Sequence, residues 1–578
     1  MQQLPVGESD FKTLRQQDYY FIDKSLFIRD IVEGAAKVSL ITRPRRFGKT
    51  LNMTMLRYFL DITQADENRE LFKGLAIEND PAFEKHYGKY PVIYLSFKDL
   101  KSLTFQDALQ KIVELVSQVF QEHDYVIDSQ HLDKKDRDDF LLIRSEKAPF
   151  TKLESSLKTL LKCLSGHWQV KPYILIDEYD TPIHTAYHNS SPKEIDEIDS
   201  YYYKLIAFMK SFLGSALKDN VNLQKGVITG ILRVAKESIF SELNNPGIFT
   251  VVTNEFAGYF GFTPAEVDSL LADLDLTEKK EDIEKWYNGY IFGQETLYNP
   301  WSILNSCAYP TNRLKPYWAN TASNEILRDL IRKSPGKIKQ KLFDLLKEKP
   351  LLSTINENIV FNDLVANEVT VLSFLLFSGY LKAGYVKMEN DESYYELSIP
   401  NTEVKLIFKA IVNDWFGRKY SNQKLEDLLY ALLSQDYKLF ERLLSELVLQ
   451  TLSYFDTAGK EVEKVYQAFL LGMLVNLPQG YIVNSQKESG YGRYDIVVLP
   501  PEKTQTAIIF ELKTIDDFHG ETKDEALDAA LRQIEEKQYE TDVRKQGYDH
   551  IAKLGVTFDG KRVWVKVDEG RQEIIPAQ

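Results

Sequence analysis

A strand, a loop with adjacent glycine and lysine, and a helix follow one another near the N-terminus, and this order constrains the fold more than any other feature. Residues 37–42 are rich in β-branched and apolar side chains, and apolar residues recur at helical spacing after Lys49. The loop between them ends in Gly48, Lys49 and Thr50. Because backbone N–H groups at the start of such a helix bind phosphate, the segment predicts a nucleotide-binding α/β domain built on a parallel sheet.

The loop supplies the groups that would hold a nucleotide and its metal ion. Lys49 is expected to reach the β and γ phosphates of ATP, and Thr50 is expected to bind Mg²⁺. The predicted nucleotide-binding residues of this loop are Arg45, Arg46, Phe47, Gly48, Lys49, Thr50 and Leu51. Such loops usually begin with glycine, but Arg43 occupies that position here. The segment alone could therefore also be a basic loop before an ordinary helix.

An acidic pair at the end of a second apolar segment favours the nucleotide-binding alternative. Residues 173–176 have the composition of a buried strand and lead directly into Asp177 and Glu178. The carboxyl end of a central parallel strand is where Mg²⁺ and an attacking water lie in phosphate-loop domains. We therefore predict that Asp177 binds Mg²⁺ and that Glu178 orients or deprotonates the water.

Two further apolar segments, residues 91–96 and 226–230, are predicted to be strands of the same sheet. The second contains Thr229 near its end, where a group that senses the γ-phosphate would lie. Arg233 follows, and either it or one of the loop arginines could stabilise charge during phosphoryl transfer. A surface cation on a helix is a nearly equal interpretation of Arg233.

A second group of charged residues lies near the C-terminus, on two segments with the composition of paired strands. Asp495 stands near the start of one segment, and Glu511 and Lys513 stand near the end of the next. Because side chains alternate along a strand, Glu511 and Lys513 share one face. Two converging carboxylates repel each other unless a cation joins them, so Asp495 and Glu511 are predicted to bind Mg²⁺ or Mn²⁺. Lys513 would position the attacking water or the developing charge.

A helix predicted over residues 526–539 adds a third element to this candidate catalytic site. Gln533 and Lys537 share one face of the helix, beside small residues that allow close packing on the sheet. Both side chains could therefore point at a substrate phosphate, and we include Gln533 among the catalytic candidates. A solvated helix edge is an equally good interpretation of both residues.

Several short segments together resemble the bacterial AAA-ATPase-like family, whose members usually carry a C-terminal PD-(D/E)XK nuclease-type domain. The resemblance extends over nearly the whole chain and rests on Asp23-Lys24 and on the motifs RPRRFGKTLNM, KYPVIYLSFKD, LIDEYDTPI, TGILRVAKESIFSELNN, WYNGYIFG, LYNPWSILN and YWANTASN. It implies a bacterial, cytoplasmic protein that binds ATP. It also implies that Arg43 is the family's own form of the phosphate loop. Tyr20 or Phe21 would lie beside the adenine or else pack in the core.

The C-terminal residues match the PD-(D/E)XK pattern at the two carboxylates and the lysine named above. Such nucleases often carry a further acid on the preceding helix, which would be Glu463 or Glu461 here. Residues 485–486 are Ser and Gln where an acid is expected. This difference would weaken a second metal site.

Composition limits the compartment and the way in which a partner can bind. The formal net charge of −14 means that any nucleic-acid site must be a local basic groove, because the overall field repels phosphate. Two cysteines, Cys163 and Cys307, fit a reducing compartment. The longest apolar stretch, residues 468–475, is far shorter than the ~20 residues of a membrane span, and residues 1–10 do not form a secretory signal. We expect a cytoplasmic protein with no membrane partner.

We predict four parts along the chain. An AAA-like phosphate-loop ATPase domain with a parallel sheet occupies residues 1–275, and a lid and winged-helix-like subdomain occupies residues 276–415. A helical linker follows at residues 416–455. Residues 456–578 are predicted to form an α/β domain of the restriction-endonuclease type, with the PD-(D/E)XK residues on its sheet.

The middle part contains two aromatic clusters, residues 286–290 and 298–302. They could form a lid over the nucleotide, but the favoured interpretation is that they anchor a helical subdomain against the sheet. A helix over residues 367–381, followed by a β-hairpin, predicts the winged-helix module. The helix carries no Lys or Arg, so it is expected to couple the domains and not to read DNA.

The combined motifs predict an ATP-binding, ATP-hydrolysing protein coupled to a metal-dependent nuclease, with DNA favoured over RNA as the substrate. The alternative is a non-catalytic regulator in which ATP switches an interaction surface and the nuclease fold only binds. A homo-oligomer is one possibility for the assembly. Arg233 or Arg45 could then act in trans across a ring, or either could act in cis in a monomer.

Overall fold

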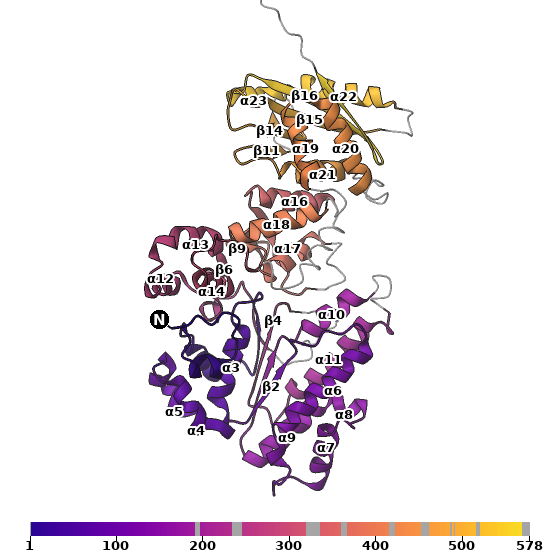
Figure 1. The fold of residues 1–578 in the computed structure, drawn as a ribbon. Coiled ribbons are helices and arrows are strands. Elements are labelled where there is room, and N and C mark those ends of the chain that lie inside the picture. Colours follow the sequence, from indigo (N-terminus) through magenta and orange to yellow (C-terminus); the bar gives the residue numbers. More distant parts are fainter. Residues whose placement is uncertain are drawn as a thin grey trace, which may run out of the picture. The chain divides into compact units, whose positions relative to one another are not determined.

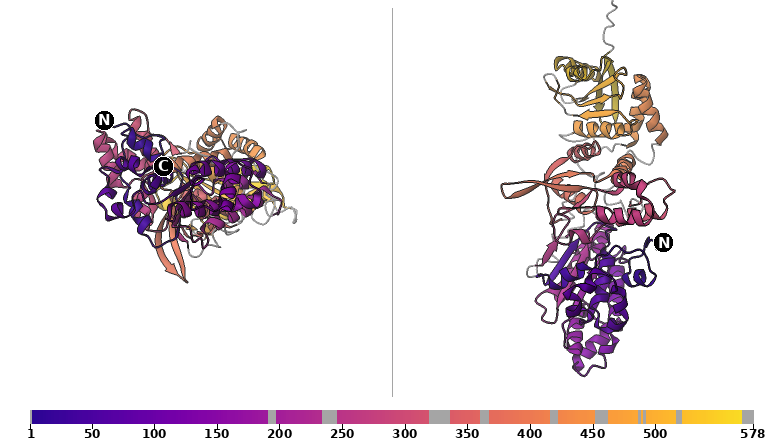
Figure 2. Two further views of the ribbon diagram at one scale, coloured as in Figure 1. Left: turned by 90° about the horizontal axis from the view of Figure 1, so that it is seen from below. Right: turned by 90° about the vertical axis from the view of Figure 1, so that its left-hand side faces the viewer.

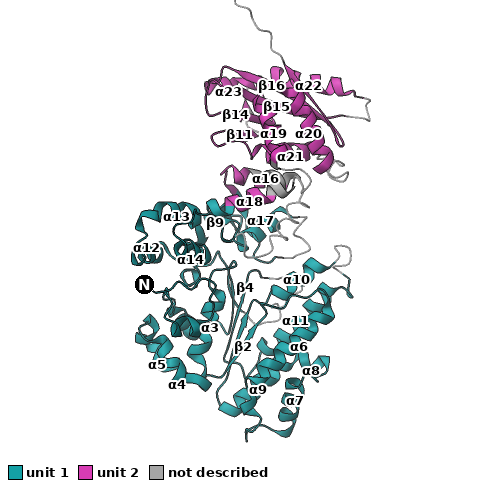
Figure 3. Cartoon of the chain, in the orientation of Figure 1, with its two compact units in different colours: residues 1–326, 352–404 teal, residues 327–351, 405–578 magenta. Residues whose placement is uncertain are grey.

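The computed structural model describes residues 2–190, 197–233, 246–318, 336–359, 367–415, 422–451, 462–485, 488–489, 492–515 and 521–568. Two compact units divide the chain (Figure 3). Unit 1 contains residues 1–326 and 352–404, and unit 2 contains residues 327–351 and 405–578. The helix α18 (Thr402–Trp415) begins in unit 1 and continues in unit 2.

A five-stranded sheet forms the centre of unit 1, and all four of its strand pairs are parallel. The strand order is β2-β3-β4-β1-β5 (Figure 1). The strands are β1 (Val38–Thr42), β2 (Val92–Ser96), β3 (Tyr173–Asp177), β4 (Lys225–Gly230) and β5 (Gly247–Phe249). The parallel sheet predicted from the sequence is confirmed, and β1 and β3 are buried along their whole length, as strands covered on both faces must be.

Helices cover this sheet on both faces. Helix α3, which follows the phosphate loop, packs against β2 and β3 on one face, and α6 packs against β2 (Figure 1). The helices of this part are α1 (Phe11–Gln16), α2 (Leu26–Glu33), α3 (Lys49–Leu60), α4 (Ala65–Asn68), α5 (Pro81–His86), α6 (Phe105–Gln121), α7 (Lys134–Arg144), α8 (Phe150–Glu154), α9 (Ser156–Trp168), α10 (Thr181–Asn189) and α11 (Tyr201–Leu217). The sheet and these helices form the α/β layers that a phosphate-loop domain requires.

A small helical layer follows in the chain and packs around its own core. Its elements are α12 (Pro264–Asp273), α13 (Lys280–Tyr287), β6 (Tyr290–Phe292), β7 (Glu295–Leu297) and α14 (Pro300–Ala308). Tyr287 and Tyr298 are buried in this core, and Trp286 and Trp301 pack against it. The aromatic clusters therefore anchor a helical subdomain, which was the favoured interpretation of the sequence.

Unit 1 also contains the predicted helix and hairpin. Helix α17 (Glu368–Phe377) precedes β9 (Lys382–Glu389) and β10 (Glu392–Ser398), and β8 (Leu351–Thr354) completes a sheet in the order β8-β10-β9. Asn390 and Asp391 form the tip with positive φ values of 51° and 63°, the conformation that two-residue hairpin turns require. Figure 2 shows the hairpin projecting from its surroundings.

Unit 2 is built on a mixed sheet in the order β11-β14-β15-β16-β17, in which β15 and β16 are parallel and the other pairs are antiparallel. The strands are β11 (Ile482–Ser485), β14 (Ile496–Leu499), β15 (Ala507–Thr514), β16 (Ile551–Asp559) and β17 (Arg562–Asp568), with a separate pair β12 (Glu488–Ser489) and β13 (Gly492–Arg493). The helices are α16 (Gly336–Leu346), the rest of α18, α19 (Asn422–Leu433), α20 (Tyr437–Thr451), α21 (Val462–Leu474), α22 (Lys523–Glu536) and α23 (Glu540–Lys545). The predicted strand pair that carries Asp495 and Glu511 is β14 and β15.

Within the described part of the chain, no helix combines the length and the apolar character needed to cross a membrane.

Candidate ATPase and nuclease sites

The phosphate loop of unit 1 holds its lysine against its own backbone. The Lys49 ammonium is buried and donates hydrogen bonds to the carbonyl oxygens of Arg43 and Pro44 at 2.9 and 2.8 Å. Burial lowers the pKa of Lys49, while the nearby carboxylates of Glu178 and Asp177 raise it. Lys49 therefore lies near Asp177 and Glu178, the two carboxylates predicted to act on the same nucleotide.

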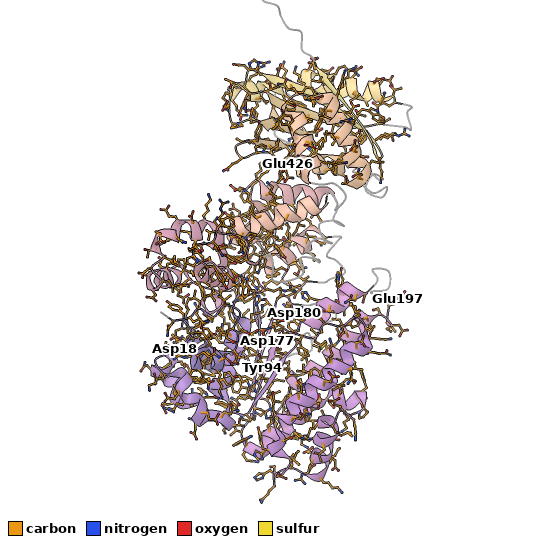
Figure 4. All side chains as sticks on the ribbon, viewed as in Figure 1. Asp18, Tyr94, Asp177, Asp180, Glu197 and Glu426 are labelled. Carbon is orange, nitrogen blue, oxygen red and sulfur yellow. The ribbon has the colours of Figure 1, made fainter. Side chains whose placement is uncertain are left out.

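The ends of two strands and the first turn of α3 meet at Asp177, which is labelled in Figure 4. The Thr50 hydroxyl donates to Asp177 Oδ2 at 2.7 Å, and the Thr229 hydroxyl donates to Asp177 Oδ1. Asp177 and Thr229 are fully buried, whereas Thr50 is half-buried. Three residues that the sequence predicts from separate segments are thus brought together, because the carboxyl ends of parallel strands share one edge of the sheet.

Glu178 follows Asp177 in a conformation that a non-glycine residue adopts rarely. Its φ angle is +53°, in the left-handed region, and its carboxylate accepts a hydrogen bond from the Thr181 hydroxyl at 3.2 Å. Such local strain clusters at functional sites. The charge of Glu178 also raises the pKa of Arg46 in the phosphate loop, against the larger lowering effect of burial.

Arg43 has a structural role that its position in the motif does not reveal. The guanidinium is completely buried and donates to the carbonyl oxygens of Thr42, Phe249 and Glu255 at 2.8, 2.8 and 3.2 Å. It also lies 5.3 Å from the centre of the Phe260 ring. Burial lowers the pKa of Arg43 to about 9. The residue at the usual glycine position therefore fastens the loop to β5 and the segment after it.

Other loop residues contact the helical layer. The Phe47 ring is fully buried, and its centre lies 5.0 Å from the ring centre of Tyr290 and 5.0 Å from that of Phe292. The Arg46 guanidinium lies 4.3 Å from the ring centre of Trp301. Phe47 can therefore meet a nucleotide only through its backbone, and its side chain joins the loop to the β6–β7 hairpin.

The remaining loop positions are compatible with phosphate binding. Gly48 caps α3 with a φ of +83°, a conformation that favours glycine, and Leu51 lies half-buried in the first turn of the helix. Arg45 is half-buried, and its carbonyl oxygen accepts a hydrogen bond from the indole of Trp318 at 3.3 Å. The N–H groups at the start of α3 are the donors that an anion would meet.

Arg233 lies just beyond β4 and is half-buried, and its carbonyl oxygen accepts a hydrogen bond from the Ile359 backbone at 3.3 Å. Residues 234–245, which complete the motif, lie outside the described residues. At the N-terminus, the Tyr20 hydroxyl donates to Asp273 at 2.7 Å, and the Phe21 ring packs edge-on against Phe11. Both aromatic residues are thus engaged in packing.

A carboxylate in unit 2 is held between two secondary-structure elements. Asp495 directly precedes β14, and its Oδ2 accepts a hydrogen bond of 2.8 Å from the backbone N–H of Leu512 in β15. The side chain of Gln467 in α21 donates to the Asp495 carbonyl oxygen at 3.0 Å. These contacts fix Asp495 beside Glu511, as the strand pairing predicts.

Glu511 is the buried centre of this site. Its side chain is 2% exposed, its Oε1 lies 3.4 Å from the Lys513 ammonium, and its Oε2 has no hydrogen-bond partner among the described residues. Burial and then the charge of Asp495 raise the pKa of Glu511 to about 8. A buried carboxylate oxygen without a donor, beside a second carboxylate, fits a divalent cation. The described residues contain no cluster of three or more His, Cys, Asp or Glu that would complete a metal site from protein ligands alone.

A tyrosine that follows α22 was not among the residues predicted from the sequence. Gln533 donates a hydrogen bond of 3.2 Å to the hydroxyl of Tyr539, which follows the helix. Burial raises the pKa of Tyr539, the hydrogen bond from Gln533 lowers it, and the charges of Glu511 and Asp495 raise it further. Its position six residues after Gln533 was the only signal in the sequence.

Of the two helix acids proposed from the nuclease pattern, Glu463 is exposed on α21, and its charge raises the pKa of Glu511. Glu461 lies outside the described residues. Lys537 is the C-cap of α22, and its side chain lies beside Gly492. Ser485 ends β11, and residue 486 is outside the described part.

Comparisons with known proteins identify a domain family in each half of the chain. Residues 5–240 match the family model AAA-ATPase-like, described as predicted AAA-ATPase, and residues 461–568 match a model of the PD-(D/E)XK nuclease superfamily. These matches confirm the resemblance found in the motifs. Each family model covers the residues that form one of the two candidate sites.

One relative matches almost the full chain. A protein of Azotobacter chroococcum, described as "Uncharacterized protein in vnfD 5'region", is 25% identical over 566 residues, which is 96% of each chain. Among solved structures, the Walker-type ATPase of Pyrococcus abyssi matches 68% of this chain and 97% of its own, with 13% identity and a TM-score of 0.35. The Aeropyrum pernix ORC1 protein in complex with DNA matches 68% and 93%, with 12% identity and a TM-score of 0.24.

Proposed function

We propose that this chain, which joins an AAA-ATPase-like domain to a PD-(D/E)XK nuclease superfamily domain, is a nuclease controlled by ATP. Residues 1–275 bind and hydrolyse ATP, residues 276–455 transmit the nucleotide state, and residues 456–578 cleave a nucleic acid. DNA is the favoured substrate, and the cytoplasm is the expected compartment. The observation that carries the proposal is the buried Glu511, which lies beside Asp495 and the half-buried Lys513, since a buried carboxylate is costly unless it serves a site.

In the ATPase site, Lys49 exchanges its hydrogen bonds to loop carbonyls for the phosphate oxygens of ATP. Thr50 and Asp177 hold Mg²⁺, and Thr229 lies within hydrogen-bond reach of the same aspartate. Glu178 accepts the proton of the attacking water, and Arg233 or Arg45 stabilises the charge that develops on the phosphoryl group. Two copies of the chain would be needed if either arginine acts in trans.

In the nuclease site, Asp495 and Glu511 would hold Mg²⁺ or Mn²⁺, which would supply positive charge at the scissile phosphate and lower the pKa of a water. Lys513 orients that water and stabilises the phosphate oxygens, since its ammonium lies on the same strand face as Glu511. Gln533 holds the Tyr539 hydroxyl toward the site, where it can donate to the substrate phosphate.

Cleavage assays on purified protein test the proposal. Supercoiled plasmid, linear DNA and RNA are incubated with Mg²⁺ or Mn²⁺, each with and without ATP. We expect metal-dependent cleavage of DNA that Asp495→Ala abolishes and that Lys49→Ala frees from ATP control. If the folded wild-type protein binds ATP but cleaves none of these substrates under any condition, the chain is better explained as a regulator that ATP switches.

A further inference from the structure

Tyr179 and Asp180, which follow the acidic pair Asp177-Glu178, hold the turn after β4. Asp180 is 1% exposed, and its Oδ2 accepts hydrogen bonds from the backbone N–H groups of Ile231 and Leu232 at 2.8 and 2.9 Å. The Tyr179 hydroxyl donates to the Leu232 carbonyl oxygen at 2.6 Å. These three bonds fix the chain between Thr229 and Arg233, both of which the sequence assigns to the nucleotide.

Tyr179 and Asp180 pack closely against the turn after β4, and we call these two residues the clamp. A Cβ atom at Gly230 would lie 2.7 Å from the Tyr179 ring and 3.0 Å from Asp180 Oδ1, so only glycine allows the two segments to approach this closely. The Tyr179 backbone N–H donates to the Thr229 carbonyl oxygen at 3.1 Å. The His184 Nε2 lies 3.2 Å from Asp180 Oδ2 and so supports the carboxylate from α10.

The electrostatics of Asp180 agree with a fixed, ionised acceptor. Burial alone would raise its pKa, but the hydrogen bond and charge of His184 and the backbone N–H groups of Leu232 and Ile231 hold the pKa below its usual value. An ionised oxygen with two backbone donors holds the turn more firmly than a neutral acceptor would. Asp177, three residues earlier on the same motif, bonds Thr229 directly.

We infer that Tyr179 and Asp180 are positioning residues that hold Thr229 and Arg233 in the geometry that recognises the γ-phosphate of ATP. The inference rests on the proposed ATPase function and extends it. One acidic motif thus has two tasks. Its first half serves the metal and the attacking water, and its second half couples them to the β4 turn. The clamp favours ATP over ADP, because only ATP carries the γ-phosphate that Thr229 and Arg233 would contact.

The test compares affinities for ADP and for an ATP analogue with a non-hydrolysable β–γ linkage, measured by isothermal titration calorimetry with Mg²⁺. Removing the clamp by Asp180→Ala should reduce the preference for the analogue about tenfold, the size of a typical coupling between sites, with little change in ADP affinity. Asp180→Asn keeps an oxygen for both backbone donors and should retain most of the preference. Glu114→Ala, an exposed carboxylate on α6, is the matched control and should behave as wild type.

A purely structural defect would weaken both nucleotides together and leave the ratio of affinities unchanged. Tyr179→Phe, which removes only the hydroxyl, is the second variant if Asp180→Ala does not fold, and it should reduce the preference about threefold. In steady-state ATPase assays, the folded clamp variants should show a raised KM for ATP, in line with their weaker binding of the analogue.

An unchanged ratio of affinities in folded Asp180→Ala or Tyr179→Phe would overturn the inference alone. A wild-type chain that binds neither nucleotide would overturn the ATPase proposal and the clamp with it. The two failures are therefore distinguishable in the same experiment.

Discussion

The indole N–H of Trp318 donates a hydrogen bond of 3.3 Å to the carbonyl oxygen of Arg45 in the phosphate loop. The backbone N–H of Trp318 in turn donates to Glu403 Oε1, and the Ser302 hydroxyl donates to Glu403 Oε2, both at 2.8 Å. Glu403 lies in the first turn of α18. A buried carboxylate therefore links the loop to α14 and to the start of the helix that continues into unit 2.

Glu403 should make stability depend on pH. Burial raises its pKa from the ordinary 4.5 to about 7, against the lowering effect of its hydrogen bonds. The folded state thus holds the proton more tightly than the unfolded chain, so the stability that this proton contributes is complete below pH ~4.5 and lost as pH rises through ~7. Glu403→Gln stays neutral, and its stability relative to wild type should increase by about 3 kcal/mol between pH 4.5 and 8.

Urea unfolding of both proteins at each pH measures this difference. Glu348→Gln is a suitable control, because Glu348 is largely exposed and its pKa is lowered by the hydrogen bond and charge of Lys405. That variant should not gain stability as pH rises. A Glu403→Gln difference that stays constant with pH would mean that Glu403 titrates normally in the fold.

Restoring the usual glycine at position 43 should harm the protein. Arg43→Gly removes three hydrogen bonds to backbone carbonyls and empties the space beside Phe260, so we expect a loss of about 3 kcal/mol in the free energy of unfolding. Arg45→Gly removes a half-buried side chain without such bonds and should cost less than ~1 kcal/mol. Thermal unfolding of the two variants measures the contrast. Equal stabilities would show that the buried guanidinium does not fasten the loop.

The contacts of Arg43 also mark the limit of prediction from this sequence. The meeting of Thr50, Asp177 and Thr229 could be predicted, because parallel strands place their carboxyl ends at one edge. Arg43 donates hydrogen bonds to Phe249 and Glu255, which lie more than 200 residues away in the chain, so no local sequence pattern predicts these contacts.

Local turns and long-range packing differ in the same way elsewhere in the chain. A polar tip of the β9–β10 hairpin at residues 390–392 was predictable, because turn chemistry is local, although the structure shortens the turn to Asn390 and Asp391. Phe47 was grouped with the nucleotide-binding residues, but an aromatic ring inside a motif does not reveal that it packs on Tyr290 and Phe292. Tyr539 was missed because only the folding of the chain after α22 returns its hydroxyl to Gln533.

Metal ions should stabilise unit 2 through Glu511. A cation that binds only the folded state adds about 2.7 kcal/mol at a hundred times its dissociation constant. The wild-type melting temperature should therefore rise with Mn²⁺ or Mg²⁺. Glu511→Gln should lose this response and melt higher than wild type in EDTA, because it no longer buries a carboxylate oxygen without a donor.

Differential scanning fluorimetry with EDTA, Mg²⁺ and Mn²⁺ makes this measurement without any substrate. Glu536→Gln, an exposed position on α22, serves as the control and should respond to metal like wild type. A metal response that survives in Glu511→Gln would assign the ion to another part of the chain.

Gln533 and Tyr539 should act as one unit in cleavage. Tyr539→Phe keeps the ring against Tyr494 and the backbone bond from the Ser489 hydroxyl to the Tyr539 carbonyl, so the fold should be retained. It removes the hydroxyl that Gln533 holds toward the carboxylates, and the single-turnover cleavage rate should fall about tenfold.

Gln533→Leu should reduce the rate by a similar factor, because an unheld hydroxyl no longer points at the phosphate. The double variant should then be no slower than either single variant, since residues that work through one hydrogen bond are not additive. Metal-dependent melting should stay unchanged in all three proteins, which separates this effect from loss of the cation. Independent, multiplying losses would instead mean that Gln533 contacts the substrate by itself and that Tyr539 only packs.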